Sequence, residues 1–172
     1  MPTWERLEQA GCWPALFLTI KEVLFEPSKT FARMPREPLL GRPLLFNVIV
    51  ATIGALATAF YELIMWRYVP SSSSYRRLFE IVNIAPEQIS FPVLALCALF
   101  AAAIVVFLTA IWAFIRAGIF HITLMMFGGA NESYETTFRT LCYTAGAADI
   151  FGIVPFCGWI IGGIWGVVCA AI

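Results

Sequence analysis

The sequence predicts an all-α fold, a polytopic membrane helical bundle of about four transmembrane helices preceded by N-terminal interfacial helices. The first observation behind this prediction is a continuous apolar run over residues 91–127, interrupted only by Arg116 and His121. As one helix this run spans roughly 55 Å, against about 30 Å of bilayer hydrocarbon. The second is composition, because 60% of the residues are hydrophobic, only 13% are charged and the mean hydropathy is +0.83. Both observations are typical of an integral membrane protein.

Charge and cysteine usage narrow the classes of function. The formal net charge is zero, so nothing in the composition favours a nucleic-acid partner. The five cysteines are scattered and lie mostly within apolar runs, so we interpret them as small buried hydrophobes and expect no metal or cofactor. Basic side chains gather before the first apolar run, which predicts a cytoplasmic N-terminus by the positive-inside rule. They are Arg6, Lys21, Lys29, Arg33, Arg36 and Arg42.

Residues 1–43 are predicted to form a cytoplasmic leader with short amphipathic helices. Leu16 and Ile20 recur at helical spacing in a stretch that is too short to cross a bilayer. We expect this helix to lie in the cytoplasmic membrane interface, with Trp4 and Trp13 as anchors at the lipid headgroup level. The alternative is a helix packed on the protein's own transmembrane bundle.

Residues 44–172 are predicted to form the transmembrane domain. A proline-rich joint separates it from the leader, and the apolar stretches that follow have lengths suited to crossing the bilayer. The spans are expected near residues 44–66, 91–127, 135–154 and 158–172. No charge, aromatic girdle or cap closes the last stretch. We therefore expect the final span to be truncated.

The long run over 91–127 is expected to travel from the outside back to the cytoplasm. Arg116 then arrives near the cytoplasmic boundary, where its side chain can snorkel, and His121 lies about one turn further on. The double glycine at 128–129 ends the helix. In the preceding span, Glu62 lies about one turn inside the outer end, so it is not expected to pair with Arg116.

The helix predicted over 135–154 begins polar and becomes apolar, which indicates that it enters the bilayer from the cytoplasmic side. It carries Arg139, Tyr143 and Asp149. An aspartate that faces acyl chains is costly, so we expect Asp149 to face the interior of the bundle.

The last predicted span carries a glycine face. Its members lie four residues apart and so share one side of a helix: Gly158, Gly162 and Gly166. Such a face is a packing surface for a second helix, in this chain or in another copy. The competing explanation is that membrane helices are rich in glycine in any case.

Polar side chains in the spans form the candidate functional site, because such groups are costly in hydrocarbon and are retained for a reason. Four of the six share the cytoplasmic side by depth, and the last two lie farther in or outward. They are Arg116, His121, Arg139, Tyr143, Asp149 and Glu62. For His121 and Tyr143, a hydrogen bond that holds two helices together is the competing interpretation.

Two stretches resemble the Yip family of multi-span membrane proteins, named for interaction with Ypt and Rab GTPases. The first is TIKEVLFEPSKTFARM, which precedes the proline-rich joint. The second, at 120–165, has a helix ending in a double glycine, an S-x-x-x-T-x-R connection, a tyrosine, and a proline and glycine between two spans. The resemblance implies about five spans and, from the compact loops, a bacterial-type member in the inner membrane. It implies no settled activity, and GTPase binding is not carried over because no matching residue can be named.

Two functions follow as hypotheses. The first is a scaffold that organises membrane partners or lipid, with the bilayer as partner and a second protein or second copy at the glycine face. The alternative is a small-solute or lipid transporter with a polar site inside the bundle. A water-filled cavity lined by Arg116, His121 or Asp149 would favour the transporter. An enzyme is not expected, because one histidine with no clustered carboxylates or nucleophile and base supports no reaction.

Overall fold

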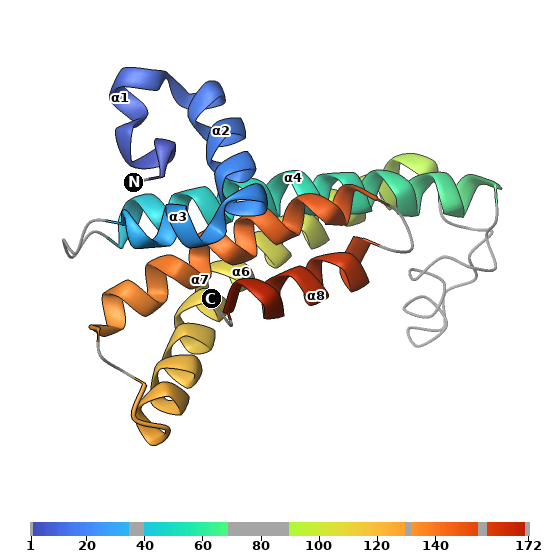
Figure 1. Ribbon diagram of the computed structural model, residues 1–172. Helices are drawn as coiled ribbons and strands as arrows, with labels where there is room; N and C mark the ends of the chain where they lie inside the picture. The colour runs from blue at the N-terminus through green and yellow to red at the C-terminus, as the bar shows by residue number, and fades with distance from the viewer. Residues whose placement is uncertain (1, 35–39, 69–89, 130–131, 155–157, 171–172) are drawn as a thin grey trace.

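The computed structural model of the chain describes residues 2–34, 40–68, 90–129, 132–154 and 158–170, and these are helical throughout apart from short connections (Figure 1). The predicted all-α class is therefore confirmed. In order, the elements are the 3-10 helix η1 (Thr3–Arg6), α1 (Leu7–Ala10), α2 (Cys12–Phe25), α3 (Pro27–Ala32), α4 (Gly41–Tyr68), α6 (Phe91–Met126), α7 (Tyr134–Asp149), the 3-10 helix η4 (Ile150–Ile153) and α8 (Gly158–Ala170).

The helices α4 and α6 are the long outer helices of the bundle. Among the described residues, Gly41–Met65 and Phe91–Met126 are the two segments long and apolar enough to cross a membrane. Only 28% and 17% of their most apolar stretches are buried within the protein. A core helix of a soluble protein would be mostly covered, whereas these helices leave apolar surface for lipid. Their exposure supports the membrane placement.

The helix α7 is the central helix, in contact with α2, α4, α6 and α8. Its buried residues run almost without interruption from Phe138 to Ala147, and they include Arg139 and Thr144. Lipid offers no hydrogen-bond partners, so the most polar helix of the bundle is the one surrounded by the others.

Glycines allow the closest approaches to α7. A Cβ added at Gly146 would lie 2.7 Å from Cε1 of Phe46, so α4 and α7 meet there at a distance that only glycine permits. On α8, a Cβ added at Gly162 would lie 2.9 Å from the carbonyl oxygen of Ala148, and one at Gly158 would collide with the carbonyl of Phe151. A Cβ at Gly166 would meet no described atom within 4 Å. Two of the three glycines on the predicted face thus pack within the chain.

The helix expected over 135–154 changes type along its length. It is α-helical to Asp149 and continues as η4, after which α8 runs back along α7 (Figure 1). The turn expected at residues 155–157 lies outside the described residues. The α8 helix has 13 residues and is roughly 20 Å long, which is shorter than the hydrocarbon layer. Four complete crossings therefore remain a prediction.

The N-terminal helices lie over α4 and α7 (Figure 1). Residues of α2 such as Leu16 and Ile20 share a core cluster with Phe46 of α4 and Tyr143 of α7. One face of α2 therefore packs on the protein's own bundle, as the alternative prediction stated. The opposite face exposes large apolar side chains: Trp13, Phe17, Leu18 and Phe25. The interfacial position of that face stays a prediction.

Candidate functional site

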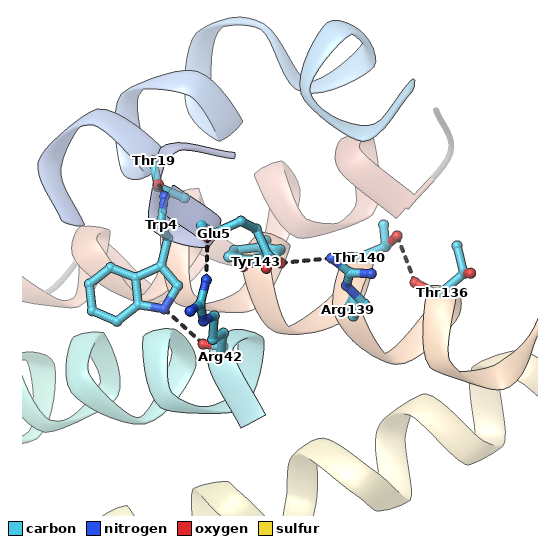
Figure 2. A network of polar contacts seen from close by, with 8 residues as sticks. All are labelled: Trp4, Glu5, Thr19, Arg42, Thr136, Arg139, Thr140 and Tyr143. Carbon is cyan, nitrogen blue, oxygen red and sulfur yellow. Dashed lines mark hydrogen bonds and ion pairs between the residues drawn. The ribbon is translucent and has the colours of Figure 1, made fainter. Parts of the chain in front are cut away.

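A buried ion pair joins the start of the chain to the centre of the bundle. Arg139 on α7 donates from Nη2 to Oε1 of Glu5 at 2.8 Å, and both side chains are only 1% exposed. Tyr143, one turn further along α7, donates its hydroxyl to the same Oε1 at 2.7 Å (Figure 2). Buried charges require such partners, since an isolated ion in a low-dielectric interior is strongly disfavoured. Glu5 therefore neutralises the arginine that α7 buries.

Further hydrogen bonds hold the segment that carries Glu5. The backbone N–H of Trp4 donates to Oγ1 of Thr19 at 2.7 Å, and the Trp4 indole donates to the carbonyl of Arg42 at 2.8 Å (Figure 2). The Arg42 guanidinium in turn donates to the carbonyl of Glu5 and reaches Glu8 at 3.0 Å. These contacts tie η1 to α2 and to the start of α4. We call Trp4, Glu5, Arg42, Arg139 and Tyr143 the N-terminal clamp.

The prediction that Trp4 anchors at the lipid headgroups is wrong. It is 1% exposed and packs edge-on against Phe46 at 5.7 Å between ring centroids, so it is a core residue and does not anchor at the lipid headgroups. Trp13 is 65% exposed, as an interfacial anchor would be. The two tryptophans differ because η1 folds back onto the bundle while the start of α2 does not.

A cavity lies among α6, α7 and α8. Its volume is about 530 Å³, and its charged lining residues are Arg116 of α6 and Asp149 of α7. Arg116 donates from Nη2 to the carbonyl of Leu141 at 3.3 Å, and its Nε is buried without a hydrogen-bond partner among the described residues. Glycines of α8 and Thr144 complete much of the wall. We call this the Arg116 cavity.

A second cavity, of about 320 Å³, lies between α4 and α6. Its lining is made almost entirely of small and apolar residues, including Ala51, Ala98 and Ala102. Asp149 and Gly152 line both cavities. Asp149 therefore lies between the two cavities.

A family comparison agrees with this membrane architecture. The model of the Yip1 domain matches residues 21–172, which is most of the chain. The chain belongs to the Yip1 domain family. No curated protein and no solved structure matches it. The resemblance found in the sequence is thereby confirmed, and this Yip1 protein is a membrane protein with multiple helical spans.

The Yip1 domain match begins at residue 21, so the N-terminal clamp combines residues from inside and outside it. Arg42, Arg139 and Tyr143 lie within the matched part, whereas Trp4 and Glu5 precede it. The Arg116 cavity lies wholly within the matched part. In this Yip1 protein, the leader thus supplies a counter-ion to an arginine of the domain.

The structure divides the six predicted site residues into separate groups. Arg139 and Tyr143 come together, and so do Arg116 and Asp149 at the cavity. Asp149 is half-buried and lines both cavities. His121 bonds through Nδ1 to Oγ1 of Thr137 at 2.9 Å, which joins α6 to the first turn of α7.

Glu62 lies toward the other end of α4. Its neighbour Tyr61 donates to the carbonyl of Ile153 at 2.7 Å, which places this part of α4 beside η4. The clamp contacts the opposite end of α4, at Arg42. Glu62 therefore belongs neither to the clamp nor to the lining of the Arg116 cavity.

Sequence reasoning missed Glu5 and Thr144. A signal for Glu5 was present, because an arginine in a membrane helix needs a counter-ion. The acidic residues of the predicted site all lie in the spans, whereas Glu5 lies in the leader. Thr144 gave no signal, since a threonine in a membrane helix ordinarily satisfies its own hydroxyl.

The clamp and the Arg116 cavity differ in how much space they leave for a ligand. Within the described ranges, no three His, Cys, Asp or Glu side chains are placed to hold a metal ion. In the clamp, Glu5 is already engaged by Arg139 and Tyr143. The Arg116 cavity differs, because its charged groups face a space large enough for a ligand.

Proposed function

We propose that this Yip1 protein binds a membrane lipid in the Arg116 cavity and takes part in lipid handling within the bilayer. In the proposal it resides in a bacterial inner membrane with its N-terminus in the cytoplasm. The observation that carries the proposal is the presence of a cation and a carboxylate on the wall of one cavity inside a membrane bundle. Charged side chains within a membrane bundle are costly, so their retention indicates a functional role such as binding or transport.

The size and setting of the cavity suit a lipid headgroup. Ligand pockets range over about 300–1,000 Å³ and are mostly apolar with a few placed polar groups. The Arg116 cavity has about 530 Å³, with Arg116, Thr144 and Asp149 as its polar groups among alanine, glycine and larger apolar residues. The apolar cavity between α4 and α6 borders it at Asp149. A ligand with a polar head and an apolar tail matches this combination.

The N-terminal clamp supports the proposal by fixing the cavity wall. Arg139 and Tyr143 lie on the α7 face held by Glu5, while Thr144 and Asp149 line the cavity. Because the same helix carries both sets, ordering one face orders the other. A binding site needs such rigid support for its polar groups.

Native mass spectrometry of the purified protein with its retained lipids tests the proposal. We expect Arg116→Gln to lose most of the bound lipid, because the cation that contacts the headgroup is gone, and Arg116→Lys to retain part of it. Arg33→Gln, which changes an exposed arginine of the leader, is the matched control and should leave lipid retention unchanged. Equal retention by Arg116→Gln and wild type would contradict the proposal, provided that both elute as folded, monodisperse protein.

A scaffold role is the second candidate, and the outer face of α2 favours it. Trp13, Phe17 and Phe25 are 65%, 64% and 76% exposed beside the bundle. This face can hold either the membrane surface or an apolar partner. The predicted glycine face supports a protein partner or homo-oligomer less, because Gly158 and Gly162 contact α7 and η4.

Photo-crosslinking from α2 distinguishes these occupants. A photoreactive residue at Phe17 is expected to give a discrete protein adduct in native membranes if the face holds a partner. The same residue at Gln9, which is exposed on α1, serves as the control. Lipid adducts alone at Phe17 would support the interfacial position and count against the scaffold.

A further inference from the structure

The polar groups of the Arg116 cavity are of two opposite kinds. Arg116 brings a permanent positive charge, and Asp149 brings a carboxylate. Within the described part of the chain the two form no ion pair with each other, and neither pairs with another charged side chain. Both charges are therefore available to a ligand. A ligand that satisfies the two must itself carry a negative and a positive group.

Thr144 adds an independent observation that points to a ligand. Other helical threonines, including Thr52, Thr109 and Thr140, donate their hydroxyl to the carbonyl four residues earlier at 2.7–3.0 Å. Thr144 does not, although it is 4% exposed, and its Oγ1 has no partner among the described residues. A buried hydroxyl without a partner costs about 1–3 kcal/mol. Its position on the wall of the cavity suits it to donate to an anionic oxygen there.

The spacing of the polar residues along α7 predicts the direction in which the ligand lies. Asp149 follows Thr144 by five residues, a rise of roughly 7.5 Å toward the η4 end of the helix. Arg116 reaches the carbonyl of Leu141, so its guanidinium lies at the Thr144 level or closer to the start of α7. The anionic group of the ligand therefore belongs near Arg116 and Thr144, and its cationic group belongs further along, near Asp149.

The α8 wall leaves room for the ligand. A Cβ added at Gly163 or at Gly166 would meet no described atom within 4 Å, and both residues line the cavity. This contrasts with Gly162, which packs against Ala148. The two open glycines let a ligand approach the backbone of α8 closely.

We propose that the ligand of the Arg116 cavity is a zwitterionic phospholipid with a primary amine, as in phosphatidylethanolamine, whose phosphate is bound by Arg116 and Thr144 and whose ammonium is bound by Asp149. This inference rests on the proposed lipid binding. The phosphate oxygens accept from the guanidinium and the hydroxyl, and the ammonium donates to the carboxylate. An anionic lipid without an amine meets the same arginine but is repelled by Asp149.

Titration of lipids into the delipidated protein in detergent micelles, read by native mass spectrometry, tests the inference. We expect wild type to bind phosphatidylethanolamine about tenfold more tightly than phosphatidylglycerol, the gain typical of one added charge-assisted hydrogen bond. Asp149→Asn is expected to remove this preference. Thr144→Val should weaken the binding of both lipids. It should leave the protein folded, because the Thr144 hydroxyl has no described protein partner. Glycerophosphoethanolamine, the headgroup without acyl chains, tests a soluble source and should bind more weakly than the lipid.

The outcomes separate the two proposals. Equal binding of the two lipids by wild type would overturn the zwitterionic ligand and leave lipid binding intact, provided that Arg116→Gln abolishes both. Lipid binding that is unchanged in Arg116→Gln would overturn both proposals. Tight binding of glycerophosphoethanolamine without any gain from acyl chains would support the headgroup chemistry and reject a membrane lipid as its source. The wild-type comparison needs no variant, so a misfolded Asp149→Asn protein would not prevent the test.

Discussion

At the scale of single residues, the clamp shows how a membrane helix accommodates an arginine. The side chains of Arg139 and Glu5 are each 1% exposed. The Tyr143 hydroxyl and the Arg139 guanidinium both donate to the same carboxylate oxygen of Glu5. Removing one partner of a buried pair leaves an uncompensated charge and costs about 3–5 kcal/mol, whereas an exposed pair contributes about 0–1 kcal/mol. The Glu5–Arg139 and Glu8–Arg42 ion pairs should therefore differ greatly in their contribution to stability.

Glu5→Gln is expected to destabilise the protein by about 3 kcal/mol, because the buried Arg139 would lose its ion pair with Glu5. Glu8→Gln breaks the Arg42–Glu8 pair, whose side chains are 39% and 84% exposed, and should change stability by less than about 1 kcal/mol. Thermal or denaturant unfolding in detergent measures both. Similar stability of the two variants would show that the clamp is not an essential part of the fold.

Tyr143→Phe is expected to destabilise the protein by about 1–2 kcal/mol, since one hydrogen bond to a charged group is lost while the ring stays packed on Phe46 at 5.2 Å. Tyr134→Phe is the matched control, because the Tyr134 hydroxyl bonds to the carbonyl of Phe114 in an exposed setting. The same unfolding assay compares them. A larger loss in Tyr134→Phe would argue against the clamp as the stronger contact.

At the scale of helices, α7 organises the bundle because its two sides carry different contacts. One side joins the N-terminal clamp, and another lines the Arg116 cavity and meets α8. The contact with α8 depends on small residues, since membrane helices associate by close packing when no hydrophobic force drives them together. Adjacent glycines of α8 differ in this respect, so they can be compared directly.

Gly162→Ala is expected to destabilise the protein, because its Cβ would lie 2.9 Å from the carbonyl oxygen of Ala148 and force α7 and α8 apart. Gly163→Ala adds the same methyl group one position along, where no described atom lies within 4 Å. It should leave stability unchanged or raise it by up to about 1 kcal/mol through helix propensity. Melting temperatures in detergent decide the matter, and equal shifts for the two variants would contradict this account of α7–α8 packing.

At the scale of the whole molecule, the helices alternate in direction. In Figure 1, α4 and α7 start at the end of the bundle that carries the N-terminal helices, and α6 ends there. The basic leader lies at this end, and the positive-inside rule predicts that this end is the cytoplasmic one. Most of the exposed apolar surface belongs to α4, α6 and α8, where lipid would surround the protein.

Cysteine labelling tests this orientation. With the other cysteines replaced by serine, a chain that keeps only the exposed Cys12 should react with an impermeant maleimide in inside-out vesicles and not in right-side-out ones. A chain whose only cysteine comes from Ser90→Cys, at the start of α6, should show the reverse pattern. Labelling of both positions from the same side would overturn the arrangement of α4 and α6 as consecutive crossings.

The sequence by itself determined the membrane class, the all-helical fold class and the family resemblance. These follow from hydropathy, length and the order of local motifs, all of which are properties of neighbouring residues. Most residues of the candidate site could also be recognised from the sequence, because a charged residue in a hydrophobic stretch is conspicuous. Arg116 and Asp149 are examples.

Only the tertiary structure decided which of these residues meet. Glu5 and Arg139 are 134 positions apart, and nothing in either local sequence indicates that they pair. Trp4 and Trp13 were given the same prediction from the sequence, yet of the two only Trp4 is buried, because η1 folds back onto the bundle. The residues of the predicted candidate site are divided in the structure between the N-terminal clamp on one side of α7 and the Arg116 cavity on another. Burial and pairing depend on which helices become neighbours, and that choice is made by packing at sites such as Gly146 and Gly162.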